Sequence, residues 1–311
     1  MQVVARRLVD WQAIASFALA GDGSAYAGEE TGYRVCGWSQ SGELVWSREL
    51  PPRKHAMITQ QHAFVQLVGD DLFAFASLTS ALHVLDRDTG KTIREVAFPE
   101  SYACSVTPDA STLVLISGTT QLLAYPSGAI RASFDQPSTG TSWAMRGSML
   151  VTCGFQSGPV LYVYDVAKPR LVHTIEVPLQ VHAVCFTADG RLVAGDVAGV
   201  VRSYNPSSGS QLAGPEPGPR ARKLQYSKPR TIDAIAAGAQ HIAAAHRNGT
   251  VTLFDSRTLA PSTSITGHDT AIPDSTSKHF WQVTFATDGS LWMSAHRKRE
   301  PVGLICYPRP R

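Results

Sequence analysis

The chain has 311 residues, of which 43% are hydrophobic, 17% charged and 8% aromatic, and its 28 Lys and Arg against 25 Asp and Glu give a net charge of +3. This balance excludes a histone-like basic protein and an acidic disordered chain. No apolar run approaches the roughly 18 residues of a membrane-spanning helix. The five cysteines include no Cys-x-x-Cys pair, which argues against a zinc finger or a disulfide scaffold.

The beginning of the chain has some features of a secretory signal peptide. A pair of arginines precedes the apolar residues 13–20, and Ala25-Tyr26-Ala27 resembles a cleavage site. However, Asp10 lies beside the apolar run, and Gly21-Asp22-Gly23 interrupts it. The same residues also fit a pattern that recurs six more times, so we expect them to be part of the fold and expect a cytoplasmic protein.

The recurring pattern begins with a turn between two apolar stretches. Asp-Gly between alternating hydrophobic residues is a strong hairpin signal, because both residues tolerate positive φ. In chain order, these first turns are at Asp22-Gly23, Asp70-Asp71, Pro108-Asp109, Arg146-Gly147, Asp189-Gly190, Ala239-Gln240 and Asp288-Gly289. A second turn follows about 18 to 20 residues later, as expected of a four-strand repeat. These second turns are at Ser41-Gly42, Asp88-Thr89-Gly90, Ser127-Gly128, Lys168-Pro169, Ser208-Gly209 and Ser256-Arg257.

The mean period of about 44 residues is that of a four-stranded propeller blade, and seven such units need about 308 residues. No segment sustains the spacing of an amphipathic helix. The sequence therefore predicts an all-β, single-domain, seven-bladed β-propeller with four antiparallel strands in each blade. The alternative is a pair of sandwiches or barrels, which would not require this period. The blades are expected at residues 13–50, 62–98, 101–135, 142–177, 182–213, 232–266 and 281–307.

The last of these units lacks a fourth strand. Residues 1–9 precede the first unit and include four apolar residues, so they can supply the missing strand. Such pairing would hide the open edges of a ring. We therefore expect residues 1–9 to complete the last blade.

The repeats resemble those of the WD-repeat β-propeller superfamily, in a divergent form, over essentially the whole chain. The resemblance is carried by the Asp-Gly turns and by strands that end in Leu85-Asp86, Tyr164-Asp165 and Phe254-Asp255, where the family often has Trp-Asp. Only Gly267-His268 matches the Gly-His pair of the family, so the family's hydrogen-bonded tetrad is not carried over. The resemblance implies a rigid scaffold for protein partners.

Signatures of common enzymes are missing from the sequence: there is no Gly-x-Ser-x-Gly, no His-Glu-x-x-His and no Walker-type loop. Gly21-x-Gly23 begins like a dinucleotide loop, but it lies between two strands and is interpreted as a hairpin turn. The cysteines fall in predicted strands of different blades, where we expect small core residues rather than reactive thiols or metal ligands. They are Cys36, Cys104, Cys153, Cys185 and Cys306. No cofactor is expected.

The repeat places several polar and aromatic residues on one face, the face of the loops that connect the blades. His246-Arg247 and His296-Arg297 close the second strands of the sixth and seventh units, and Asp196 takes the corresponding place in the fifth. The residues that begin inner strands at the mouth of the channel are Tyr102, Trp143, His182, Phe280 and Trp281.

Two interpretations of this face compete. Histidines and an Asp around a channel could bind a transition metal or transfer protons, which would make His246, His296 and Asp196 the catalytic residues of a propeller hydrolase or lyase. These residues lack tight ligand spacing, however. The favoured interpretation is a rim of aromatic and Arg side chains, which are typical anchors of protein interfaces.

One segment breaks the period between the fifth and sixth units. It is rich in Pro and Gly at residues 214–219, and no acidic residue occurs from 217 to 232. Its basic residues are Arg220, Arg222, Lys223, Lys228 and Arg230. We expect a functional loop on the face of His246 and His296, joined there by Arg297-Lys298-Arg299.

The basic loop could attract nucleic acid, with Tyr226, Phe280 and Trp281 to stack on bases, or an acidic protein segment, or only solvent. The small net charge favours an acidic protein or peptide. The sequence thus predicts a non-catalytic scaffold, without a membrane partner, that is a subunit of a larger complex. The expected partner-binding residues are Tyr102, Trp143, His182, Arg220, Arg222, Lys223, His246, Arg247, Trp281, His296 and Arg297.

Overall fold

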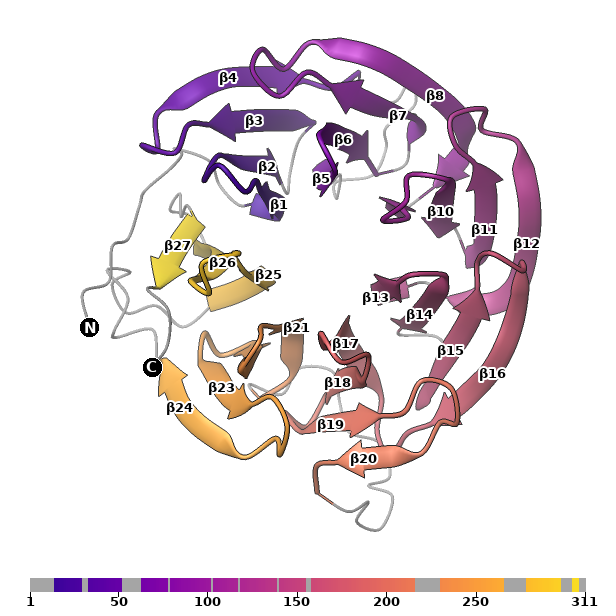
Figure 1. Ribbon diagram of the computed structural model, residues 1–311, viewed down its shortest axis with the longest axis vertical. Helices are drawn as coiled ribbons and strands as arrows, with labels where there is room; N and C mark the ends of the chain where they lie inside the picture. Colours follow the sequence, from indigo (N-terminus) through magenta and orange to yellow (C-terminus); the bar gives the residue numbers. More distant parts are fainter. Residues whose placement is uncertain are drawn as a thin grey trace. The chain divides into compact units, whose positions relative to one another are not determined.

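The computed structural model describes residues 14–29, 33–51, 63–77, 79–101, 103–116, 118–138, 140–154, 158–215, 230–265, 278–297 and 304–307. These residues form strands and turns, and among them there is no helix, hence none long and apolar enough to cross a membrane. The strands make seven small antiparallel sheets, and the fold is a seven-bladed β-propeller (Figure 1). The predicted fold class is confirmed.

The chain divides into two compact units. The first unit contains blades 1 to 3. Blade 1 has β1 (Ile14–Leu19), β2 (Ala25–Glu29), β3 (Arg34–Trp38) and β4 (Leu44–Glu49). Blade 2 has β5 (Ala63–Val68), β6 (Asp71–Ala76), β7 (Thr79–Leu85) and β8 (Thr92–Ser101). Blade 3 has β9 (Ala103–Val106), β10 (Thr112–Ile116), β11 (Gly118–Ala124) and β12 (Ile130–Ser138).

The second unit includes residues 136–293 and so holds blades 4 to 6 and β25 of blade 7. Blade 4 has β13 (Gly140–Arg146), β14 (Met149–Gly154), β15 (Val160–Asp165) and β16 (Arg170–Glu176). Blade 5 has β17 (Val181–Phe186), β18 (Leu192–Asp196), β19 (Val201–Tyr204) and β20 (Gln211–Ala213). Blade 6 has β21 (Ile232–Ala237), β22 (His241–His246), β23 (Val251–Asp255) and β24 (Pro261–Ile265). Blade 7 has β25 (Lys278–Phe285), β26 (Leu291–Arg297) and β27 (Leu304–Tyr307).

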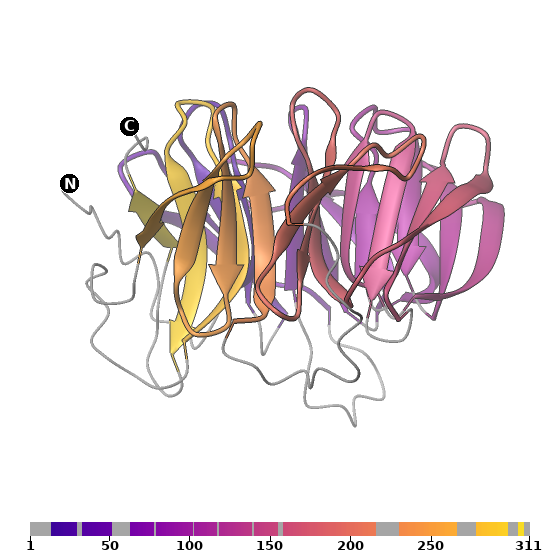
Figure 2. The same ribbon diagram turned by 90° about the horizontal axis from the view of Figure 1, so that it is seen from below.

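In each blade the antiparallel strands pair in chain order. The connections between successive strands therefore alternate between the two ends of the blade. We call one end the turn face, because the turns between the first and second strands and between the third and fourth strands lie there. The other end is the loop face, where the second strand connects to the third and one blade to the next. Figure 2 shows blades 6 and 7, orange and yellow, with connections at both ends of their strands. The predicted closure of blade 7 by residues 1–9 falls outside the described residues.

Aspartate side chains stabilise both kinds of turn, the one between the first and second strands and the one between the third and fourth. In blade 7, Asp288 Oδ1 accepts hydrogen bonds from the backbone N–H and the hydroxyl of Ser290 at 2.8 and 2.6 Å, and Gly289 supplies the positive φ of 81°. At the third-to-fourth turn of blade 6, Asp255 Oδ1 accepts from the N–H groups of Arg257 and Thr258 at 3.0 and 2.8 Å. The Asp that ends the third strand in the repeat therefore caps the turn that follows it.

The outermost strands share an irregularity. In β4, β8, β16, β20 and β24 a β-bulge occurs at the equivalent place, within the first three residues of the strand. The residues skipped by the pairing are Val45, Ile93, Val172, Leu212 and Ser262. All five are exposed, although four of them are aliphatic.

In the first unit, Trp46 of β4 joins blade 1 to blade 2. Its indole lies so close to Gly37 and Gly90 that a Cβ atom on either would be 2.5 Å from the ring. The indole Nε1–H donates a hydrogen bond to the Arg87 carbonyl oxygen at 2.7 Å. The Arg87 guanidinium in turn lies 2.8 Å from the Asp22 carboxylate of blade 1. An aromatic ring and a polar contact thus fix the two blades together on the turn face.

We expect Trp46→Ala to lower the free energy of unfolding by about 3–5 kcal/mol, because it removes a buried aromatic ring between two blades. Trp46→Phe keeps a ring but loses the hydrogen bond to Arg87, and we expect a loss of about 2 kcal/mol. Urea unfolding followed by fluorescence or circular dichroism measures both. Equal stability of Trp46→Ala and the unsubstituted protein would contradict this role.

Candidate interaction site

The structure describes the side chains of five predicted site residues, all in the second unit. Trp143 is half-buried in β13, His182 lies near the start of β17, and Asp196 ends β18. His246 ends β22 and Arg247 follows it, so both lie at the loop face of blade 6. Trp281, His296 and Arg297 belong to β25 and β26, but their side chains are outside the described part, as are Tyr102, Arg220, Arg222 and Lys223 entirely.

Asp196 is part of a buried ion pair. Its Oδ2 lies 2.7 Å from Nη1 of Arg202, and the two side chains are 3% and 8% exposed. Its Oδ1 accepts hydrogen bonds from the backbone N–H groups of Ala198 and Val200, both at 2.9 Å. The carboxylate therefore holds the turn between β18 and β19, and its bonds serve the fold.

Arg202 also binds the chain where it leaves blade 5. Its Nε–H donates a hydrogen bond to the Pro215 carbonyl oxygen at 3.3 Å. Pro215 directly precedes residues 216–229, which include most of the basic segment. Buried Arg202 thus fixes the first end of this segment to blade 5.

His246 fixes the other end. Its Nδ1 lies 2.9 Å from the carbonyl oxygen of Arg230, and because a carbonyl only accepts, Nδ1 carries the proton. Its Nε2 then accepts a hydrogen bond from the hydroxyl of Thr252 at 3.1 Å. Both ring nitrogens are used, so the ring is held in place on blade 6 and holds Arg230 with it.

A second charged group lies where blades 5 and 6 pack together. Arg247 forms two bonds to Asp233, from Nη2 at 2.7 Å and from Nε at 3.2 Å. His182 of β17 is close enough for both charges to act on it, and only 9% of it is exposed. Burial lowers the pKa of His182, while the negative charge of Asp233 acts in the opposite direction. Thr231 bridges the same two blades, since its hydroxyl donates to the Val197 carbonyl at 3.1 Å.

The repeat pattern did not predict Arg202, Asp233 and Thr252 as partners of the site residues. A buried partner for Arg202 could have been predicted, because a charged residue within the mainly apolar stretch 200–204 needs one. The pairing of Asp233 with Arg247 had no such signal, since it depends on a bulge between Ile232 and Ala234 that shifts the pairing of β21 with β22.

The cysteines lie in strands of five different blades, as predicted. Burial raises the pKa of Cys36 to about 11 and that of Cys185 to about 12, so neither thiol forms a thiolate readily.

Among the described side chains, no group of three His, Cys, Asp or Glu is placed to hold a metal ion. Comparison of the chain with protein-family models and with curated protein sequences finds no match.

Replacement of Arg202 by Met would leave the buried Asp196 carboxylate without its countercharge. We expect Arg202→Met to lower the free energy of unfolding by about 3 kcal/mol. The matched change Arg247→Met affects a pair whose side chains are 27% and 16% exposed, and we expect a loss of about 1 kcal/mol. Urea unfolding compares the two variants, and a larger loss for Arg247→Met would contradict the assignment.

Buried His182 gives stability a pH dependence. Because its pKa is lowered in the folded protein, the unfolded chain takes up the proton first as the pH falls below about 6.5, and the folded state loses stability. His83 of blade 2 behaves in the same way, since burial lowers its pKa against the opposing charge of Glu95. We expect His182→Gln and His83→Gln each to flatten the loss of stability between pH 7 and pH 5, and the double variant to flatten it most. Urea unfolding at several pH values measures this slope, and an unchanged slope in the double variant would disprove it.

Proposed function

We propose that this protein is a non-catalytic interaction scaffold that binds an acidic protein or peptide on its loop face. The recognition element is the basic segment between blades 5 and 6, together with Arg297. The observation that carries the proposal is the attachment of this segment at both ends, at Pro215 by Arg202 and at Arg230 by His246.

Attachment at both ends favours binding for an energetic reason. A segment with fixed ends has fewer conformations to lose when a partner orders it, so less of the interaction energy is spent on ordering. The five basic residues lie in a stretch, residues 217–232, that holds no acidic residue, so they attract a negatively charged surface and speed the encounter with it.

The repeats are consistent with this function, because WD-repeat propellers, which they resemble, are scaffolds for protein partners. Membership of that superfamily, a cytoplasmic location and a place in a larger complex are part of the same proposal. The hydrolase or lyase alternative requires Asp196 and His246 to exchange protons with a substrate. Since both side chains are engaged in bonds that hold the fold, the geometry favours the scaffold.

Charge reversal of the basic segment tests the proposal. We expect Arg222→Glu/Lys223→Glu/Arg297→Glu to weaken binding of a fluorescein-labelled peptide of eight glutamates at least tenfold, with an unchanged melting temperature. The matched control is Lys168→Glu/Arg170→Glu, which reverses two exposed charges at the turn face of blade 4 and is expected to leave binding unchanged.

Fluorescence anisotropy at two salt concentrations measures the affinities. Unchanged binding in the triple variant would reject the basic segment as the recognition element. Tighter binding of a single-stranded oligonucleotide with the same charge as the peptide would replace the proposal with nucleic-acid recognition.

A further inference from the structure

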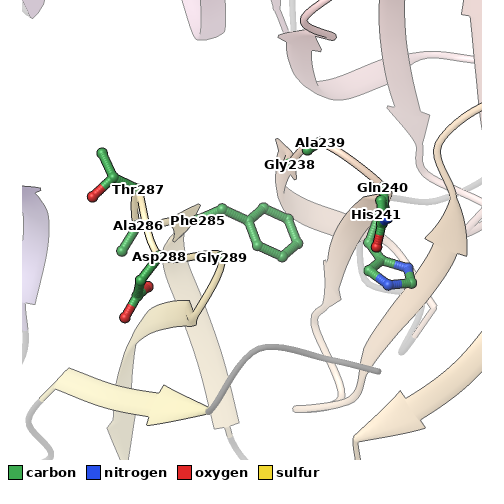
Figure 3. Close-up of a pocket in the computed structure, with 9 residues that line it drawn as sticks. All are labelled: Gly238, Ala239, Gln240, His241, Phe285, Ala286, Thr287, Asp288 and Gly289. Carbon is green, nitrogen blue, oxygen red and sulfur yellow. The ribbon is translucent and has the colours of Figure 1, made fainter.

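A glycine at each face of the second unit makes room for a neighbouring part of the chain. At the turn face, a Cβ atom on Gly238 of blade 6 would be 2.9 Å from the ring of Phe285 in blade 7. A hollow of about 210 Å³ lies beside them, between the first turns of the two blades. Figure 3 shows the Phe285 ring pointing toward blade 6 and the Asp288 carboxylate pointing away from that ring. Because the charge and the ring do not face each other, we assign Gly238 to the packing of the two blades.

At the loop face, Gly199 makes room for the backbone of Arg230. Gly199 lies in the turn between β18 and β19 of blade 5, where its φ is +82°. A Cβ atom on Gly199 would be 2.5 Å from the Arg230 carbonyl oxygen and 3.1 Å from the Arg230 Cβ atom. This carbonyl oxygen is the one that accepts the hydrogen bond from His246. Gly199 therefore lies directly against the group that attaches the second end of the basic segment.

The same turn holds the first end of the basic segment. Asp196 Oδ1 accepts hydrogen bonds from two backbone N–H groups of the turn, and its Oδ2 lies 2.7 Å from Nη1 of Arg202. The Nε–H of Arg202 donates to the Pro215 carbonyl oxygen. Pro215 and Arg230, the described residues on either side of residues 216–229, are thus both attached to one turn of blade 5.

Thr231 adds a third contact between this turn and the chain that follows the basic segment. Its hydroxyl donates a hydrogen bond to the Val197 carbonyl oxygen at 3.1 Å, and the residue is fully buried. A buried hydrogen bond of this kind is costly to lose, because the carbonyl oxygen would have no replacement partner. The backbone next to Arg230 is therefore fixed to the turn from two sides.

We propose that the turn of residues 196–200 is the positioning element of the loop-face site, with Gly199 as the residue on which it depends. This inference rests on the proposed function. A side chain at position 199 would push the Arg230 carbonyl away from His246 and release one end of the basic segment. The released segment would have more conformations to lose when a partner orders it, so its affinity for an acidic partner would fall.

Nuclear magnetic resonance of the His246 ring tests the position of Arg230 directly. In the unsubstituted protein the ring proton is on Nδ1, which donates it to the Arg230 carbonyl oxygen. We expect Gly199→Ala to move this proton to Nε2, where the Thr252 hydroxyl oxygen can accept it. Two-bond ¹H–¹⁵N spectra of the neutral ring at pH 8 distinguish the two tautomers.

The matched control is Gly158→Ala, in the corresponding turn of blade 4. Gly158 also has a positive φ, of 67°, so an alanine there is strained in the same way. Among the described residues, however, no heavy atom lies within 4 Å of a Cβ atom on Gly158. An unchanged His246 tautomer in Gly199→Ala, or the same change in Gly158→Ala, would overturn the inference.

Binding of the fluorescein-labelled glutamate peptide tests the role of the turn in recognition. Well below the melting temperatures, we expect Gly199→Ala to bind the peptide at least fivefold more weakly and Gly158→Ala to bind it normally. Equal affinity of Gly199→Ala and the unsubstituted protein would overturn the role of the turn. Absence of binding by the unsubstituted protein would instead reject the proposed function itself, whatever the tautomer of His246.

Thr231→Val tests the same turn if Gly199→Ala does not fold. Valine has a similar size but no hydroxyl for the Val197 carbonyl, whereas Thr231→Ser keeps the hydroxyl. We expect Thr231→Val to bind the glutamate peptide at least twofold more weakly and Thr231→Ser to bind it normally. Equal affinity of these two variants would contradict the positioning role.

Discussion

The close packing of neighbouring blades within each unit is the constraint on which the rest of this structure depends. It requires positions that carry no side chain: a Cβ atom on Gly28 would lie 2.1 Å from the Ala63 carbonyl oxygen of blade 2, and one on Gly195 would lie 2.6 Å from Ile232 of blade 6. At Gly195 the Ile232 side chain fills the space that the glycine leaves, and at Gly28 the backbone of the neighbouring blade itself comes close. Interiors packed in this way resist small displacements, which keeps the faces of the blades in fixed positions.

The charged residues at the loop face belong to this packing. Burial of a polar group lowers stability unless the group is hydrogen-bonded, so the polar side chains at the ends of β18 and β22 form hydrogen bonds within the fold. Asp196 forms an ion pair with Arg202, and His246 forms hydrogen bonds with the Thr252 hydroxyl and the Arg230 carbonyl oxygen. The consequence is that Asp196, through Arg202, and His246 fix the two ends of the basic segment, at Pro215 and Arg230. In the proposed function, side chains that stabilise the fold also support the recognition element.

The sequence was sufficient to predict the fold because its turns are local. Asp288-Gly289-Ser290 contains its own capping groups, and the repeat of such turns every 44 or so residues specifies a four-stranded blade. The partners of the site residues were harder to predict. Arg202 reaches Pro215 only because β20 runs back beside β19. The pairing of Asp233 with Arg247 depends on a bulge in β21 that the residue types do not predict. The hollow between blades 6 and 7 depends on the distance between two turns that lie about 50 residues apart, and no pattern in the sequence expresses that distance.

The bulges of the outer strands restrict how the propeller can assemble with other chains. An outermost strand presents unpaired N–H and C=O groups to any extended chain that approaches it, and a regular strand would accept such a chain as a further member of its sheet. A bulge in five of these strands interrupts the even spacing of those groups and turns an aliphatic side chain outward in four. Strand addition, and with it the stacking of propellers edge to edge into fibrils, is thereby opposed at the rim. In the proposed function, a partner binds at the ends of the strands instead, where the amino-acid composition differs from blade to blade and so distinguishes one surface from another.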